Sequence, residues 1–134
     1  MRYCLDTNTC IDAMKGAHPG LAAAFAAVTP DEIAVPAMVR AELLHGARRS
    51  REPRQTKAVV EAFLEPYAVI PFDRDAAEHY AAIRHELETK GTVIGPNDLI
   101  IAATARSRHL TLVTHNTKEF GRVAGLAVED WTVA

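Results

Sequence analysis

Residues 95–113 of the chain read GPNDLIIAATARSRHLTLV. Pro96 suits the first turn of a helix, where its missing N–H removes no helical hydrogen bond. Residues Asp98–Ser107 place apolar side chains on nearly every side of that helix, which predicts that it is buried. Leu110–Val113 follows as a short apolar run typical of an interior β-strand. A buried helix followed by a buried strand indicates a layered α/β fold.

The rest of the chain continues the alternation of strands and helices. Strands are predicted at Tyr3–Leu5, Ile33–Val35, Ala68–Phe72 and Leu110–Val113, with a short fifth at Ala127–Val128. Helices are predicted at Thr9–Lys15 (capped by Thr7 or Asn8), Leu21–Val28, Pro36–Arg49, Thr56–Glu65, from Asp73 or Asp75 to Lys90, and Asp98–Ser107. This order implies βαβ units. It predicts one domain over residues 1–134, an α/β/α sandwich with a central, mainly parallel sheet of four to five strands.

Composition agrees with an ordinary globular domain. The chain has 134 residues, of which 49% are hydrophobic and 24% charged. No apolar run is long enough to cross a bilayer, and Asp6 interrupts the N-terminal apolar stretch, unlike in a signal peptide. We therefore expect a cytoplasmic protein without membrane attachment. Cys4 and Cys10 lack zinc-ligand or redox spacing, so they are expected to be reduced, and Cys4 to be a core residue.

The charge distribution allows two interpretations. A net charge of −2 argues mildly against nucleic-acid binding. Positive charge is nevertheless clustered, and a local field matters more than net charge for attracting a phosphate backbone. The cluster either holds phosphates or is a solvated helix face and loop; it comprises Arg40, Arg48, Arg49, Arg51, Arg54 and Lys57.

Acidic and amide side chains recur near the ends of the predicted strands. Asp6 follows the first strand directly, Asp98 starts the buried helix, and Glu42 lies on the helix after the second strand. Asn116 follows the fourth strand, with Glu119 shortly after it. Parallel strands direct these groups to one sheet edge, the usual ligand-binding edge. Converging carboxylates repel each other, and hard oxygen ligands suit Mg²⁺ or Mn²⁺.

Each of these residues also has a purely structural explanation. Asp6 could cap a helix, and Asp98 could satisfy free N–H groups and the helix dipole. Glu42 lies on an apolar face and needs a partner, either an arginine or a metal ion. His45, three residues later on the same helix, could orient Glu42 or lie at the surface.

Four segments give the chain a resemblance to the PIN-domain family, and more closely to its VapC-type toxins. They are Leu5–Asn8, Val39–Leu43 with Gly46–Ala47, Gly95–Ala103, and Val113–Phe120. The resemblance implies a PIN fold and a Mg²⁺- or Mn²⁺-dependent endoribonuclease whose acidic triad is Asp6, Glu42 and Asp98. Many PIN proteins carry a fourth acid where this chain has Asn116. Either Asn116 or Glu119 therefore supplies the fourth polar group, and Thr7, Asn8 and Thr114 are expected to support the site.

The same resemblance implies partners and a substrate. The partners are a VapB-type antitoxin, a second copy of the chain in a homodimer, and operator DNA reached only through the antitoxin. Structured RNA such as tRNA is the expected substrate. In the expected mechanism, Asp6 and Asp98 hold the metal and Glu42 completes the cluster or helps to deprotonate the attacking water.

Two other functions fit part of the sequence. A phosphatase of the haloacid dehalogenase kind also starts with an Asp after the first strand, but it needs a second acid where this chain has Asn8. A catalytically silent PIN-fold module that binds RNA or protein is the main alternative. Since silent modules lose their acids, the three acids retained here favour an active enzyme.

Overall fold

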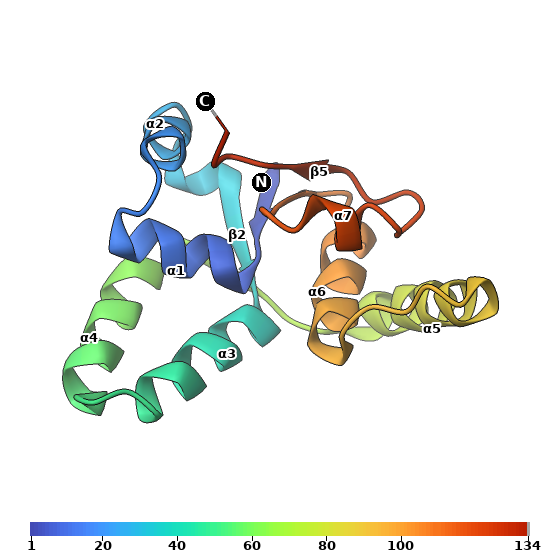
Figure 1. The fold of residues 1–134 in the computed structure, drawn as a ribbon, viewed down its shortest axis with the longest axis horizontal. Helices are drawn as coiled ribbons and strands as arrows, with labels where there is room; N and C mark the ends of the chain where they lie inside the picture. The colour runs from blue at the N-terminus through green and yellow to red at the C-terminus, as the bar shows by residue number, and fades with distance from the viewer. Residues whose placement is uncertain (134) are drawn as a thin grey trace.

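A computed structural model describes residues 1–133 and contains one five-stranded sheet (Figure 1). All of its strand pairs are parallel, in the order β3-β2-β1-β4-β5. The strands are β1 (Tyr3–Leu5), β2 (Ile33–Pro36), β3 (Ala68–Ile70), β4 (Thr111–Val113) and β5 (Val128–Glu129). The prediction of a layered, parallel α/β fold is confirmed.

The helices lie on both sides of this sheet. In Figure 1, α1, α2 and α4 lie on one side of β2, and α5 and α6 lie on the other. The helices are α1 (Thr7–Lys15), α2 (Pro19–Ala26), α3 (Ala37–Arg48), α4 (Pro53–Leu64), α5 (Arg74–Lys90), α6 (Pro96–Ser107) and α7 (Thr117–Phe120), with a 3₁₀ turn at Pro30–Glu32. Among residues 1–133, no helix is both long and apolar enough to span a bilayer.

Several predicted boundaries were wrong for identifiable reasons. Asp6, rather than Thr7 or Asn8, caps α1, because its carboxylate accepts the free backbone N–H of Thr9. Helices α2 and α4 start earlier than predicted, since Pro19 and Pro53 occupy first-turn positions where proline is favourable. Strand β3 ends at Ile70, short of the predicted Phe72, and β5 is Val128–Glu129. Helix α7 was not predicted at all.

The core lies between the sheet and its helices. Side chains of β1 and β2 are buried, as are those of Leu112 and Val113 on β4 and half of those on α6. The apolar character of α6 on nearly every side therefore reflects contact with the sheet on one face and with α5 on the other. Cys4 and Cys10 are both buried and free, and the burial of Cys4 confirms its predicted place in the core.

The pairing of the strands places polar residues from distant segments at one edge of the sheet. Leu5 pairs with Val113, so β1 and β4 end side by side. The residues directly after them, Asp6 and Thr114, are therefore neighbours at the carboxyl edge of the sheet. Both are buried, at 4% and 0% exposure.

Candidate active site

Asp6 is the most deeply buried acid of the site. Its carboxylate accepts a hydrogen bond from the backbone N–H of Thr9 at 2.8 Å. Burial raises the pKa of Asp6 above its ordinary value, while hydrogen bonds from Thr114 and Thr9 partly oppose that shift. Asp6 is thus both the cap of α1 and a fixed carboxylate at the sheet edge, so its structural and functional explanations do not exclude each other.

Glu42 reaches the same edge from α3. The hydroxyl of Thr7 donates to Oε1 of Glu42 at 2.6 Å, and the amide of Asn97 donates to Oε2 at 3.2 Å. Both carboxylate oxygens are therefore oriented by side chains from other elements. Arg40, the arginine nearest in sequence, instead pairs with Glu61 at 2.9 Å. His45 is exposed.

Asp98 lies in the first turn of α6 and is half-buried. Its pKa is raised from 3.8 to about 6, first by burial and then by the negative charges of Glu119, Glu42 and Asp6. Those three carboxylates come from widely separated segments, and all of them act on Asp98. The structure thus brings four acids together at one edge of the sheet.

Glu119 is the fourth acid, on the short helix α7. Its Oε1 accepts from the backbone N–H of Gly95 at 3.0 Å, and its Oε2 accepts from the side-chain amide of Asn116 at 2.7 Å. These hydrogen bonds hold the pKa of Glu119 below its ordinary value. Asn116 therefore contacts a carboxylate of the site, while its own backbone N–H donates to the hydroxyl of Thr114.

Sequence reasoning missed three contributors to the site. They are the Asn97 amide, the Gly95 N–H and the Thr9 N–H, each of which donates to a site carboxylate. Asn97 directly precedes Asp98, and that adjacency was the one signal in the sequence that could have identified it. Asn8, expected to support the site, is exposed on the first turn of α1.

The donor set suits a hard divalent cation held partly through water. Within residues 1–133, no three His, Cys, Asp or Glu side chains form a compact group of direct metal ligands. Mg²⁺ commonly binds through one or two carboxylates and keeps several waters, so a wider cluster is compatible with it. Burial and then the repulsion from Glu119, Glu42 and Asp6 raise the pKa of Asp98 to about 6, and a bound cation would oppose both effects.

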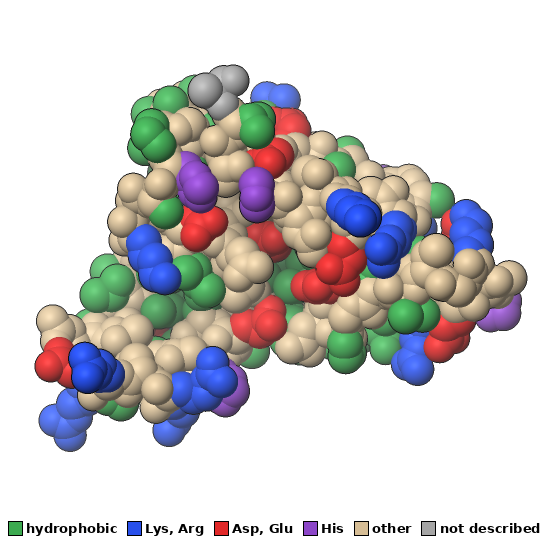
Figure 2. Space-filling model, viewed as in Figure 1, with side chains coloured by type: hydrophobic (Ala, Val, Ile, Leu, Met, Phe, Trp, Pro, Cys, Tyr) green, Lys and Arg blue, Asp and Glu red, His purple; other side chains and the backbone are tan. Residues whose placement is uncertain are grey.

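Charges are segregated on the surface that carries the site. Figure 2 shows acidic side chains around a central hollow and basic side chains gathered toward the lower left, over α3 and α4. Most members of the basic cluster are exposed: Arg48, Arg49, Arg51, Arg54 and Lys57. The basic cluster is therefore a solvent-exposed surface next to the face that carries the acids.

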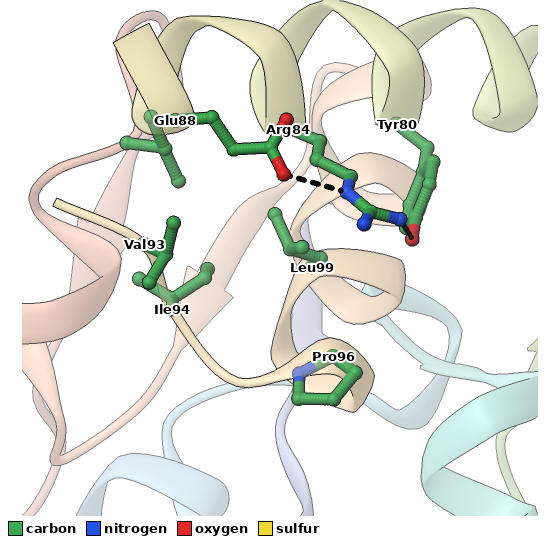
Figure 3. Close-up of a pocket in the computed structure, with 8 residues that line it drawn as sticks. Tyr80, Arg84, Glu88, Val93, Ile94, Pro96 and Leu99 are labelled. Carbon is green, nitrogen blue, oxygen red and sulfur yellow. Dashed lines mark hydrogen bonds and ion pairs between the residues drawn. The ribbon is translucent and has the colours of Figure 1, made fainter. Parts of the chain in front are cut away.

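A separate pocket lies between α5 and α6. It has a volume of about 190 Å³ and is lined mainly by apolar side chains (Figure 3). Arg84 at its rim donates to Glu88 at 3.3 Å and to the Tyr80 hydroxyl at 3.1 Å. Its polar groups thus satisfy one another, and none of the four site carboxylates lines it.

Comparisons with known proteins agree with this arrangement. The PIN domain family model matches residues 3–126. The chain is 40% identical to the tRNA(fMet)-specific endonuclease VapC of Salmonella typhimurium and 38% identical to ribonuclease VapC2 of Rickettsia felis, covering 98% of each chain in both pairs.

Solved structures give the same result for the fold. A DNA-bound VapBC structure from Salmonella typhimurium matches with a TM-score of 0.92 and 40% identity, covering 98% of both chains. VapBC2 from Rickettsia felis, bound to a promoter DNA fragment, matches with a TM-score of 0.90 and 36% identity, covering 98% of this chain and 99% of that one. The chain therefore belongs to the PIN-domain family, within its group of VapC ribonucleases.

Proposed function

We propose that this chain is a Mg²⁺- or Mn²⁺-dependent endoribonuclease and the toxin of a type II toxin–antitoxin pair. The observation that carries the proposal is the convergence of Asp6, Glu42 and Glu119 on Asp98 at a single sheet edge, where their charges contribute to its raised pKa. A silent binding module has no need for a buried, mutually repelling acid cluster, because such a cluster destabilises the fold.

The relatives support a substrate and partners. The Salmonella typhimurium relative is named for cleavage of tRNA(fMet), so tRNA is the first substrate to test. The structural relatives are VapBC complexes, two of them with DNA. We extend this to a VapB-type antitoxin for the present chain, with operator DNA bound through the complex. Homodimerisation remains a prediction.

In the proposed reaction, the residues of the chain position water and phosphate. Asp6 and Asp98 would hold a bound cation, directly or through water, and Glu42, which Thr7 and Asn97 orient, would accept a proton from the attacking water. Glu119, fixed by Asn116, adds the fourth carboxylate. A bound divalent cation supplies Lewis acidity and stabilises the charge that develops on the phosphodiester.

The test is cleavage of total cellular RNA and of an initiator tRNA transcript in Mg²⁺, Mn²⁺ or EDTA. Asp98→Asn is the key variant, and Asp75→Asn is its matched control because Asp75 lies in the first turn of the neighbouring helix α5. We expect discrete cuts that need metal, disappear in Asp98→Asn and persist in Asp75→Asn. Cuts that survive in EDTA or in Asp98→Asn would refute the proposal.

A further inference from the structure

Two histidines from distant segments face each other beside the acidic site. The rings of His18 and His115 have centroids 6.4 Å apart and planes inclined by 27°. His18 directly precedes helix α2, and His115 directly follows the buried Thr114 at the end of β4. Figure 2 shows two neighbouring histidine side chains on the face that carries the acidic hollow.

The ring of His115 is held in place yet remains open to solvent. Its Nδ1 lies 3.0 Å from Oδ2 of Asp130 and 3.0 Å from Oγ1 of Thr132. Even so, 67% of the side chain is exposed. A ring that two partners hold at one edge and that is largely exposed can bind a planar ligand with little loss of side-chain entropy.

The position of this pair relates it to the reaction centre. Thr114, the residue before His115, follows the strand β4 that pairs with β1, and Asn116, the residue after it, donates to Glu119. On the other side, Nε2 of His18 lies 3.6 Å from Oδ2 of Asp12 on α1, the helix that Asp6 caps. The pair therefore lies on the face that carries the acids (Figure 2), so a ligand on it would be near a phosphodiester held there.

We propose that His18 and His115 form a stacking site for an unpaired base of the RNA substrate, next to the scissile phosphate. This rests on the proposed ribonuclease function and adds a determinant of substrate position to it. Unpaired bases of RNA are commonly bound by stacking on aromatic side chains, histidine included. Stacking needs a loop or single-stranded segment, so the site selects unpaired regions of a structured RNA.

A structural role for His115 predicts a different outcome from stacking. If His115 served only to hold the segment of Asp130 and Thr132, then its Nδ1 would matter and its ring face would not. His115→Asn keeps a side-chain amide that can bond Asp130 and removes the ring. His115→Phe keeps a ring and removes the hydrogen bond. His18→Asn and His18→Phe form the same pair at the other ring, and the exposed His85→Asn is the control.

Binding is measured with a single-stranded oligoribonucleotide of mixed sequence that carries 2-aminopurine, in EDTA so that it is not cleaved. Quenching of its fluorescence reports stacking, and thermal unfolding checks that each variant is folded. We expect both Asn variants to bind about 5-fold or more weakly, and the Phe variants and His85→Asn to bind within about 2-fold of wild type. In cleavage assays the Asn variants should raise KM with little change in kcat.

The inference is wrong if the Asn variants bind as tightly as wild type, or if the Phe variants lose as much affinity as the Asn variants. Wild-type cleavage of total RNA, measured in parallel, separates this failure from failure of the proposed function. An active wild type with unaffected Asn variants would overturn the stacking site alone. An inactive wild type that binds no probe would overturn both.

Discussion

Three carboxylates of the site are oriented by hydrogen bonds from groups that are not themselves ionised. Asp6 accepts from Thr9, Glu42 from Thr7, and Glu119 from Asn116. The pKa of Asp98 is instead raised to about 6, first by burial and then by its acidic neighbours. The geometry of the site is therefore organised by uncharged groups of the protein chain.

Replacing Asp98 with Asn should stabilise the metal-free protein at neutral pH. The pKa of Asp98 is 3.8 in the unfolded chain and about 6 in the folded protein. Between these two pH values the folded state therefore binds more protons than the unfolded state. The free energy of unfolding contributed by Asp98 therefore falls as pH rises from about 4 through about 6. After allowance for solvent screening at a half-exposed group, the gain in Asp98→Asn is about 1 kcal/mol at pH ~7. Urea unfolding across this pH range in EDTA tests it; parallel wild-type and variant profiles would contradict it.

Divalent cations should make the wild type more stable than Asp98→Asn. A ligand that binds only the folded state at 100 times its Kd stabilises it by about 2.7 kcal/mol. Mn²⁺ should therefore raise the Tm of the wild type and of Asp75→Asn, and leave Asp6→Asn and Asp98→Asn almost unchanged. Scanning calorimetry with Ca²⁺ and Na⁺ controls measures this. An equal rise in all four proteins would indicate a general salt effect.

Thr7→Val should impair activity more than stability. The variant removes the donor to Oε1 of Glu42, a 2.6 Å hydrogen bond, and leaves the size of the side chain unchanged. Without this donor the side chain of Glu42 can adopt several orientations, so kcat should fall about 10-fold. The free energy of unfolding should fall by about 1 kcal/mol. Thr29→Val, which removes an exposed hydroxyl that donates to Asp31, is the matched control and should retain full activity.

At the scale of elements, α6 links the core to the site. Its first turn presents Asp98, and the buried side chains of the helix pack against the sheet and α5. Ile101→Ala should lower the free energy of unfolding by about 2–5 kcal/mol, because Ile101 is 1% exposed. The adjacent Ile100 is only half-buried, so Ile100→Ala should lower it by about 1 kcal/mol. Equal losses in urea unfolding would show that the two positions are packed alike.

The elements differ in how far their sequence could predict them. The helices α5 and α6 were placed closely, since the apolar residues of α5 repeat over several turns and α6 is apolar on nearly every side after Pro96. Helix α7 spans only Thr117–Phe120, too short to show a period. The N-cap of α1 depends on a single hydrogen bond, and the start of α4 depends on a proline in its first turn. The tertiary structure determines where each of these helices begins.

At the scale of the whole molecule, the sequence did not predict the order of the strands, which determines which polar residues become neighbours in the site. Alternation predicted a parallel sheet, and the polar residues after its strands predicted convergence. The pairing of β1 with β4, which puts Asp6 next to Thr114, depends on contacts between distant segments. The reach of Asn97 to Glu42 and of Glu119 to Gly95 depends on side-chain conformations that no spacing rule determines.

The C-terminal segment packs against residues of the N-terminal part of the chain. The ring of Trp131 contacts those of Tyr3 and Phe25, with centroids 5.0 and 5.3 Å apart, and is 8% exposed. Trp131→Ala should therefore lower the free energy of unfolding by about 3–5 kcal/mol. Val133→Ala, at a side chain 66% exposed, should change it by less than about 0.5 kcal/mol. Similar Tm values for the two variants would show that this segment contributes little to folding.

The four acids are supplied by segments that stretch from Asp6 to Glu119, nearly the full length of the chain. A nascent polypeptide therefore has no complete reaction centre until Glu119 has left the ribosomal exit tunnel and α7 can fold.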